Sequence, residues 1–182
     1  RIVYTPMHGV GRKRIEEVLR RAGYDDVWTV PEQAEPDPDF STVAFPNPEE
    51  PHALDLAMAL ASKKNADLII ANDPDADRLA ICVPVEGGWR QFTGNEVGII
   101  LAEDLLSKCA TTNEQLLVAT TIVSTPLLAQ IAGHYGVSHV ETLTGFKWIA
   151  NKAIEFEETG GRFVIGFEEA LGYCIGSVVR DK

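Results

Sequence analysis

Residues 68–83, LIIANDPDADRLAICV, place three aspartates between two apolar runs. Asp73, Asp75 and Asp77 alternate along the chain, and Arg78 follows directly. Aspartates at positions i, i+2 and i+4 of an extended segment point to one side, where their carboxylates repel one another unless a cation gathers them. Mg²⁺ prefers such oxygens, together with phosphate and water. The pattern therefore predicts a metal site, with Arg78 as a bidentate phosphate clamp beside it.

Three other interpretations fit parts of this segment. An EF-hand loop needs Gly after the third aspartate and Glu at its twelfth position, but Arg78 and Pro84 stand there. A phosphatase of the haloacid dehalogenase type would use Asp73 as its nucleophile. Such enzymes usually carry Thr or Val where Asp77 stands, and the downstream acidic motif that they need is not found. A solvated acidic turn is the third interpretation, and strict alternation between two strands argues against it.

The rest of the chain alternates strand-like and helix-like segments. Apolar periodicity predicts helices over residues 11–23, 49–64, 95–108, 125–136 and 146–158. It predicts strands over residues 1–6, 26–30, 67–71, 78–85, 88–92, 116–121, 137–143, 162–166 and 173–179. A proline-rich segment, residues 31–51, reads as a long irregular connection. This alternation is typical of an α/β fold.

The strand and helix pattern restarts near residue 112. Shifting the first part of the chain by 113 residues places Ile15 on Leu128. We therefore expect two related three-layer α/β/α units with mixed sheets, residues 1–111 and 112–182. The second unit is short for its class, so we expect it to be truncated and the chain to be a piece of a longer protein.

Charge and cysteine content exclude several functional classes. The 182 residues include 27 acidic and 16 basic side chains, a net charge of −11. Nucleic-acid binding needs a basic footprint, which is lacking, and no apolar stretch is long enough for a membrane span. Cys82, Cys109 and Cys174 are an odd number at wide spacing, which argues against a disulfide framework or a zinc site. They fit a reducing cytosol, so we expect a cytoplasmic protein.

Several motifs resemble those of the α-D-phosphohexomutases. DPDADR (73–78) is similar to that family's metal loop, usually Asp-Gly-Asp-Gly-Asp-Arg. TPMHGVG (5–11) resembles the opening of its second domain. TGFKWI (144–149) and GFEEALGY (166–173) resemble the two substrate loops of its third domain. FPNPEEP (45–51) is closest to the phosphoglucomutase/phosphopentomutase branch.

The resemblance implies domain 2 of this family in residues 1–111 and domain 3 in residues 112–182. It also implies a phosphosugar mutase, an isomerase that interconverts sugar 1- and 6-phosphates or pentose 1- and 5-phosphates. A phosphoserine on domain 1 would phosphorylate the phosphosugar, and a bisphosphorylated intermediate such as glucose 1,6-bisphosphate would return a phosphoryl group. Domains 1 and 4 of the parent chain would be the partners, so we expect this chain alone to be inactive. A magnesium-dependent phosphatase and a non-catalytic phosphosugar-binding relative remain the alternatives.

By the same resemblance, five residues of the second unit bind substrate: Thr144, Gly145, Lys147, Glu168 and Ala170. Lys147 opens a helix, and a helix N-terminus with a nearby ammonium is a good seat for an oxyanion. Glu168 would accept hydrogen bonds from two sugar hydroxyls. Many relatives have Ser where this chain has Ala170, so one hydroxyl contact is lost and tolerance of a different sugar, such as a pentose, is expected.

The resemblance assigns further roles in the first unit. Asp73, Asp75 and Asp77 would bind Mg²⁺, and Arg78 would contact the transferring phosphoryl group, with Lys147 as a second catalytic cation. His8 is a further catalytic candidate. Glycines beside it, in the motif MHGVG, permit close backbone approach to a ligand. An ordinary turn histidine fits the position of His8 equally well.

Overall fold

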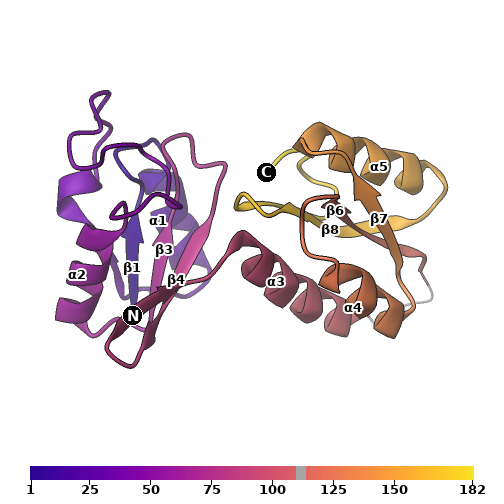
Figure 1. Cartoon of the computed structure of the whole chain (residues 1–182), viewed down its shortest axis with the longest axis horizontal. Coiled ribbons are helices and arrows are strands. Elements are labelled where there is room, and N and C mark those ends of the chain that lie inside the picture. Colours follow the sequence, from indigo (N-terminus) through magenta and orange to yellow (C-terminus); the bar gives the residue numbers. More distant parts are fainter. Residues whose placement is uncertain (110–113) are drawn as a thin grey trace. The chain divides into compact units, whose positions relative to one another are not determined.

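The computed structural model describes residues 1–109 and 114–182, and the chain folds into two α/β units, Arg1–Phe92 and Thr93–Lys182 (Figure 1). The boundary between the units precedes helix α3 (Gly94–Cys109), whereas the sequence placed it after that helix, at residue 111. The difference arises because α3 packs against strand β8 (Arg162–Glu168) and helix α4 (Leu127–Tyr135) of the second unit. Most of the linker expected around residue 112 lies outside the described residues.

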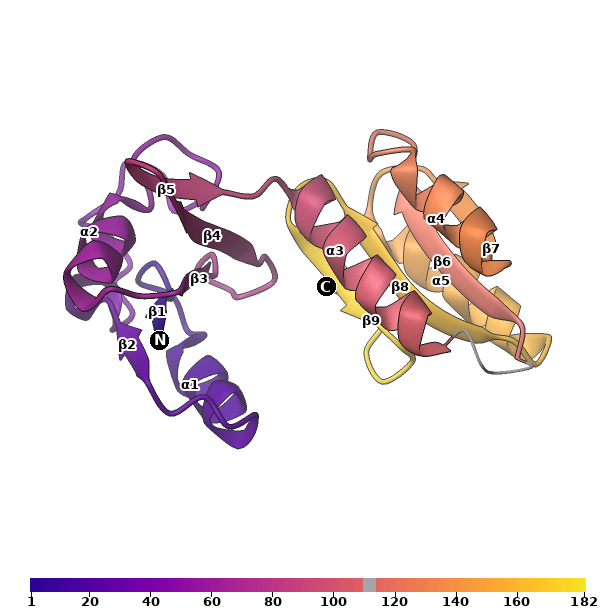
Figure 2. The same cartoon turned by 90° about the horizontal axis from the view of Figure 1, so that it is seen from below.

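The first unit is built on a five-stranded mixed sheet. Its elements are β1 (Ile2–Thr5), α1 (Arg12–Arg21), β2 (Val27–Thr29), the 3₁₀ helix η1 (Pro31–Gln33), α2 (Asp55–Lys64), β3 (Leu68–Ala71), β4 (Ala80–Val85) and β5 (Gly88–Gln91). The strand order is β2-β1-β3-β4-β5. Strands β2, β1 and β3 run parallel, and β4 and β5 are antiparallel to their neighbours. Helices α1 and α2 lie on opposite sides of the parallel strands (Figures 1 and 2).

The second unit is built on a four-stranded mixed sheet. Besides α3, its elements are β6 (Leu116–Thr121), α4 (Leu127–Tyr135), β7 (Ser138–Thr142), α5 (Phe146–Glu158), β8 (Arg162–Glu168) and β9 (Gly172–Ile175). Successive residues of β6 face two separate cores. Val118 packs in the core that includes α3 and α4, and Ala119 packs in the core that includes α5. Figure 1 shows the sheet between these two helical layers.

The two sheets share one topology. In the order β2-β1-β3-β4 and in the order β7-β6-β8-β9, the first three strands are parallel and the fourth is antiparallel. This confirms the expected fold class of two related α/β/α units with mixed sheets. It also makes the β3–β4 connection of the first unit equivalent to the β8–β9 connection of the second. Both connections leave the carboxyl end of a parallel strand, where α/β proteins commonly bind ligands.

Two predicted elements have different limits in the structure, and a third is less buried than its apolar stripe predicts. Helix α2 begins at Asp55 and not near residue 49, because His52 adopts a left-handed backbone with φ 67°. Strand β9 ends at Ile175, directly before Gly176 with φ 68°. The apolar stripe of α1 is not buried: no side chain of this helix is buried, and Val18 is 60% exposed.

No helix in the described part of the chain is long and apolar enough to cross a membrane.

Candidate metal and substrate loops

The predicted metal loop connects β3 to β4 in the first unit. Oxygen atoms of Asp73, Asp75 and Asp77, one from each carboxylate, lie within 4.8 Å of one another. Asp73 is buried, Asp77 is half-buried and Asp75 is exposed. The fold therefore gathers the three carboxylates that the sequence predicts, with one inside the protein and one open to solvent.

Electrostatics in this loop fit a hard divalent cation. The pKa of Asp73 is raised to about 6, first by burial and then by the negative charges of Asp77 and Asp75. The backbone N–H of Arg78 donates to Asp73 Oδ1 at 2.9 Å and opposes this rise in pKa. Carboxylates that repel one another in this way are stabilised when a cation neutralises them, and three oxygen donors are a suitable set for Mg²⁺.

The Arg78 side chain is loosely held beside the metal loop. Its guanidinium lies 3.5 Å from Asp73, 3.7 Å from Glu49 and 4.0 Å from Asp77. The Nε atom is buried and makes no hydrogen bond within the described residues. A buried donor without an acceptor is costly, so this N–H can gain a ligand oxygen without breaking an existing hydrogen bond.

Glycines in the β1–α1 turn make room for the metal loop. The N–H of Val10 donates to the carbonyl oxygen of Pro74 at 2.8 Å. A Cβ at Gly9 would lie 2.2 Å from the Cα and the carbonyl oxygen of Pro74. A Cβ at Gly11 would lie 3.0 Å from Ala76 Cβ. The backbone that approaches these glycines is that of the metal loop, whereas the sequence interpretation reserved the space for a ligand.

His8 is buried among residues of the long connection between β2 and α2. Its Nε2 lies 2.8 Å from Thr42 Oγ1, and its Nδ1 lies 3.9 Å from the carboxylate of Asp37. The backbone N–H of His8 donates to the carbonyl of Gln33. Gln33 is itself fully buried, and its amide donates to Thr42. These contacts give His8 a structural role, in which it fixes the connection beside the metal loop.

Asn72 is a residue of this loop that sequence reasoning missed. Its side-chain amide donates to the carbonyl of Arg78 and so closes the loop on itself. Its Oδ1 atom is buried and has no hydrogen-bond partner in the described part of the chain. The sequence signal for it is its position directly before Asp73.

We predict that Ala76→Gly leaves the fold as stable as before or stabilises it by up to about 0.5 kcal/mol. Ala76 has φ 62°, a conformation that costs a residue with a Cβ about 1 kcal/mol. The greater freedom of Gly in the unfolded chain offsets part of this gain. Urea unfolding measures the difference. Ala59→Gly on the exposed side of α2 is the control and should lose about 1 kcal/mol; an equal loss in both variants would contradict the prediction.

The predicted substrate residues lie at one edge of the second sheet, because β7 and β8 run in the same direction. Glu168 ends β8 and is buried, and its Oε1 accepts the backbone N–H of Gly145 at 2.7 Å. This bond joins the two predicted substrate loops. Thr144 and Lys147 are exposed, and Ala170 is half-buried. Lys147 stands in the first turn of α5, with Nζ 5.2 Å from the ring centre of Trp148.

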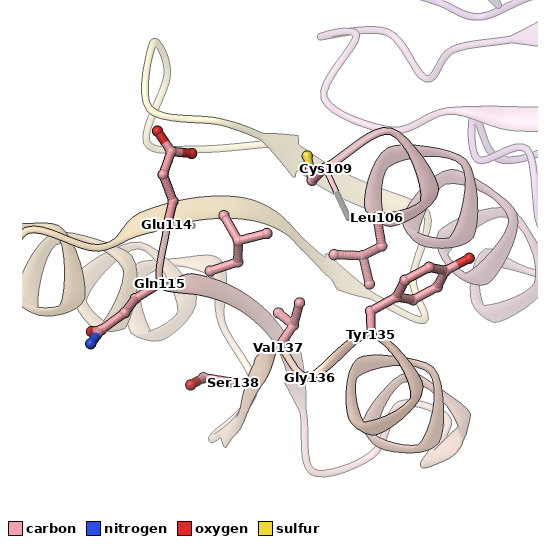
Figure 3. A pocket seen from close by; sticks show the side chains of 9 residues that line it. Leu106, Cys109, Glu114, Gln115, Tyr135, Gly136, Val137 and Ser138 are labelled. Atoms are coloured by element: carbon pink, nitrogen blue, oxygen red, sulfur yellow. The ribbon is translucent and has the colours of Figure 1, made fainter. Parts of the chain in front are cut away.

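A cavity of about 420 Å³ opens at the other end of this sheet, where β6 and β7 begin (Figure 3). Its walls include Leu106, Val137 and the ring of Tyr135. Figure 3 shows the carboxylate of Glu114 and the hydroxyl of Ser138 pointing in different directions. Ligand sites need polar groups that converge, so the cavity does not have the form of a substrate site.

Comparison with known proteins identifies the family. The description "Phosphoglucomutase/phosphomannomutase, alpha/beta/alpha domain II" matches residues 1–87, and the corresponding domain III matches residues 93–182. The chain belongs to the phosphoglucomutase/phosphomannomutase family. Both matches agree with the unit boundary before α3, and they support the resemblance drawn from the five motifs.

Named relatives come from several branches of this family. The chain is 42% identical over 192 residues to the phosphoribomutase of Saccharomyces cerevisiae, covering 99% of the chain and 31% of the relative. It is 47% identical over 182 residues to a Haemophilus influenzae protein named "Probable phosphomannomutase", covering 99% and 36%. It is 41% identical over 191 residues to the human glucose 1,6-bisphosphate synthase, covering 100% and 30%. The chain thus spans about a third of the length of these relatives.

Solved structures share the fold at lower identity. A phosphoglucomutase/phosphomannomutase family protein from Burkholderia thailandensis has a TM-score of 0.73 and 20% identity, covering 96% of this chain and 34% of that one. Parafusin, a phosphoglucomutase from Paramecium, has a TM-score of 0.70 and 21% identity, covering 100% and 30%. These similarities support the α/β architecture of both units.

Proposed function

We propose that this chain supplies the metal-binding and sugar-binding loops of a phosphosugar mutase, an isomerase that moves a phosphoryl group between two positions of one sugar. One observation carries the proposal: three convergent carboxylates stand beside Arg78, whose buried Nε lacks an acceptor among the described residues. This combination suits a metal and a phosphoryl group together. Membership of the mutase family supports the reaction class.

In the first unit, Asp73, Asp75 and Asp77 hold Mg²⁺. An ion held there would supply positive charge beside a transferring phosphoryl group. Phosphoryl transfer depends mostly on positioning and on electrostatic stabilisation of the equatorial oxygens. Arg78 donates from Nε to one of these oxygens, and its loose ion pairs with Asp73 and Glu49 allow it to turn toward the phosphoryl group.

In the second unit, Glu168 orients the sugar. The Gly145 N–H occupies its Oε1, and Oε2 accepts a hydrogen bond from a sugar hydroxyl. Lys147 and the N-terminus of α5 attract a phosphate of the substrate. Ala170 offers no hydroxyl, so the loop makes fewer contacts with a sugar and fits a pentose as well as a hexose.

The complete reaction needs groups that this chain does not supply. A phosphoserine donor and a phosphate-binding element are expected on other domains of the parent protein, and a bisphosphorylated sugar is the expected intermediate. The names of the relatives, phosphoribomutase and glucose 1,6-bisphosphate synthase, support a pentose phosphate or glucose phosphate as substrate. We further propose a cytoplasmic location, in keeping with three cysteines that form no disulfide.

A ³¹P NMR titration tests this function. We expect glucose 1,6-bisphosphate resonances to broaden or shift on addition of the chain, only when Mg²⁺ is present, and without release of inorganic phosphate. Arg78→Ala should weaken the binding of glucose 1,6-bisphosphate about tenfold, because a hydrogen bond to a charged group is lost. Arg21→Ala, on the exposed end of α1, is the matched control. Phosphate release that Asp73→Asn abolishes would instead support a phosphatase with Asp73 as nucleophile.

A further inference from the structure

The turn between β8 and β9 is fixed by its second glutamate. Glu169 Oε2 accepts hydrogen bonds from Ser124 Oγ at 2.9 Å and from Thr121 Oγ1 at 3.2 Å. The backbone N–H of Glu169 donates to Ser124 Oγ at 3.2 Å. Thr121 is fully buried, and its hydroxyl lies 2.8 Å from that of Ser124. Glu169 is thus bonded to the β6–α4 turn through both its side chain and its backbone.

The same turn is strained at Leu171 and packs closely against the start of helix α3. Leu171 has φ 64°, which is unfavourable for a bulky side chain, and that side chain is 1% exposed. On another side, α3 begins against the turn: a Cβ at Gly94 would lie 2.0 Å from the carbonyl oxygen of Glu169. Strain of this kind persists only when the surroundings fix it, and it is frequent where a loop presents functional groups.

Adjacent glutamates therefore reach two different turns. Glu168 bonds to Gly145 in the β7–α5 turn, and Glu169 bonds to Ser124 in the β6–α4 turn. A displacement of Glu169 would shift the end of β8 and with it the Glu168 carboxylate. Glu168 can select a sugar hydroxyl only if its own position is fixed, because a small misplacement of a binding group costs affinity and rate.

The first unit contains an equivalent arrangement. There the turn after the first strand contacts the loop after the third strand through the Val10–Pro74 hydrogen bond and the close approach of Gly9. That loop contains the metal-binding aspartates. In both units the first βα turn thus holds the connection that contains the functional carboxylates, by backbone contacts in one unit and by the Ser124–Glu169 pair in the other.

We propose that Glu169 is a positioning residue: its bonds to Ser124 and Thr121 fix the β8–β9 turn and thereby set the Glu168 carboxylate for sugar binding. The sugar-binding part of this inference rests on the proposed function. The positioning part concerns the Glu168–Gly145 bond alone and is testable without any ligand.

The test uses the full chain and the nearly isosteric variant Glu169→Gln. The backbone amide proton of Gly145, followed in ¹H–¹⁵N spectra, reports its hydrogen bond to Glu168. We expect this resonance to move upfield in Glu169→Gln and in Ser124→Ala, and to move no further in the double variant. Glu158→Gln, an exposed glutamate at the end of α5, is the matched control and should leave Gly145 unchanged.

The same samples are titrated with ribose 5-phosphate and glucose 1-phosphate. We expect Glu169→Gln to bind about tenfold more weakly than the wild type. If neither folded variant moves the Gly145 resonance, the positioning role is overturned. If the resonance moves as expected but the wild type binds neither sugar phosphate, the proposed function fails while the positioning role stands. If Glu169→Gln does not fold, Ser124→Ala decides the result.

Discussion

Asp73→Asn is expected to stabilise the metal-free chain by about 1 to 3 kcal/mol at pH 7 and to remove its stabilisation by Mg²⁺. Burial and two neighbouring carboxylates make the ionised form of Asp73 unfavourable in the folded protein. Asparagine keeps an oxygen that can accept the N–H of Arg78, but it has no charge to bury. It also removes one of the three anionic oxygens that a divalent ion needs.

The effect has a defined dependence on pH. The pKa of Asp73 is about 6 in the folded chain against 3.8 for a free side chain. A pKa raised by folding contributes stability that is complete below the unfolded value and is lost as pH rises through the folded value. The metal-free wild type and Asp73→Asn should therefore be equally stable near pH 3.8 and differ most above about pH 6.

Urea unfolding in the presence of a chelator, at pH 4 and pH 7, measures this difference. Thermal unfolding at pH 7 with and without Mg²⁺ measures how much Mg²⁺ stabilises each variant. Asp25→Asn is the matched control, because Asp25 is an exposed aspartate of the same unit outside the metal loop. If metal-free Asp73→Asn is less stable than the metal-free wild type at pH 7, the raised pKa of Asp73 is contradicted. If Mg²⁺ stabilises Asp73→Asn as much as it stabilises the wild type, the assignment of Asp73 as a metal ligand is contradicted.

Gly9→Ala is expected to destabilise the first unit by about 3 kcal/mol or more and to weaken Mg²⁺ binding. The added methyl group would lie 2.2 Å from backbone atoms of Pro74. Backbone atoms cannot rotate away as a flexible side chain can, so the β1–α1 turn and the metal loop must separate. Their separation breaks the Val10–Pro74 hydrogen bond and moves Asp73 and Asp75 away from their present positions.

Gly88→Ala provides the control for this substitution. Gly88 opens strand β5, and apart from its two chain neighbours no residue that the structure describes has a heavy atom within 4 Å of a Cβ added there. Gly88→Ala should change the free energy of unfolding by no more than about 0.5 kcal/mol. Urea unfolding curves give both values, and Mg²⁺ titrations followed by NMR report the metal loop. Equal stability of the two variants would show that the contact between Gly9 and Pro74 does not hold the loop.

The sequence by itself determined the helices and strands, and it predicted the cluster of carboxylates in the loop between β3 and β4. Apolar periodicity is a local property, so it located the helices and strands, including β3 and β4 around the aspartates. Asp73, Asp75 and Asp77 alternate in a short loop, so their three carboxylates must lie close to one another. The repeat of the pattern also predicted two related units, because equal periodicities produce equal supersecondary structure.

Only the tertiary structure decided which segments meet. Helix α3 belongs to the second unit because its apolar side packs on β8 and α4, and its sequence is equally compatible with either neighbour. The neighbours of Gly9, the partners of His8 and the bonding of Glu169 to Ser124 depend on residues 25 to 65 positions away. Such contacts follow from strand order and register, and a single sequence contains no local signal for either.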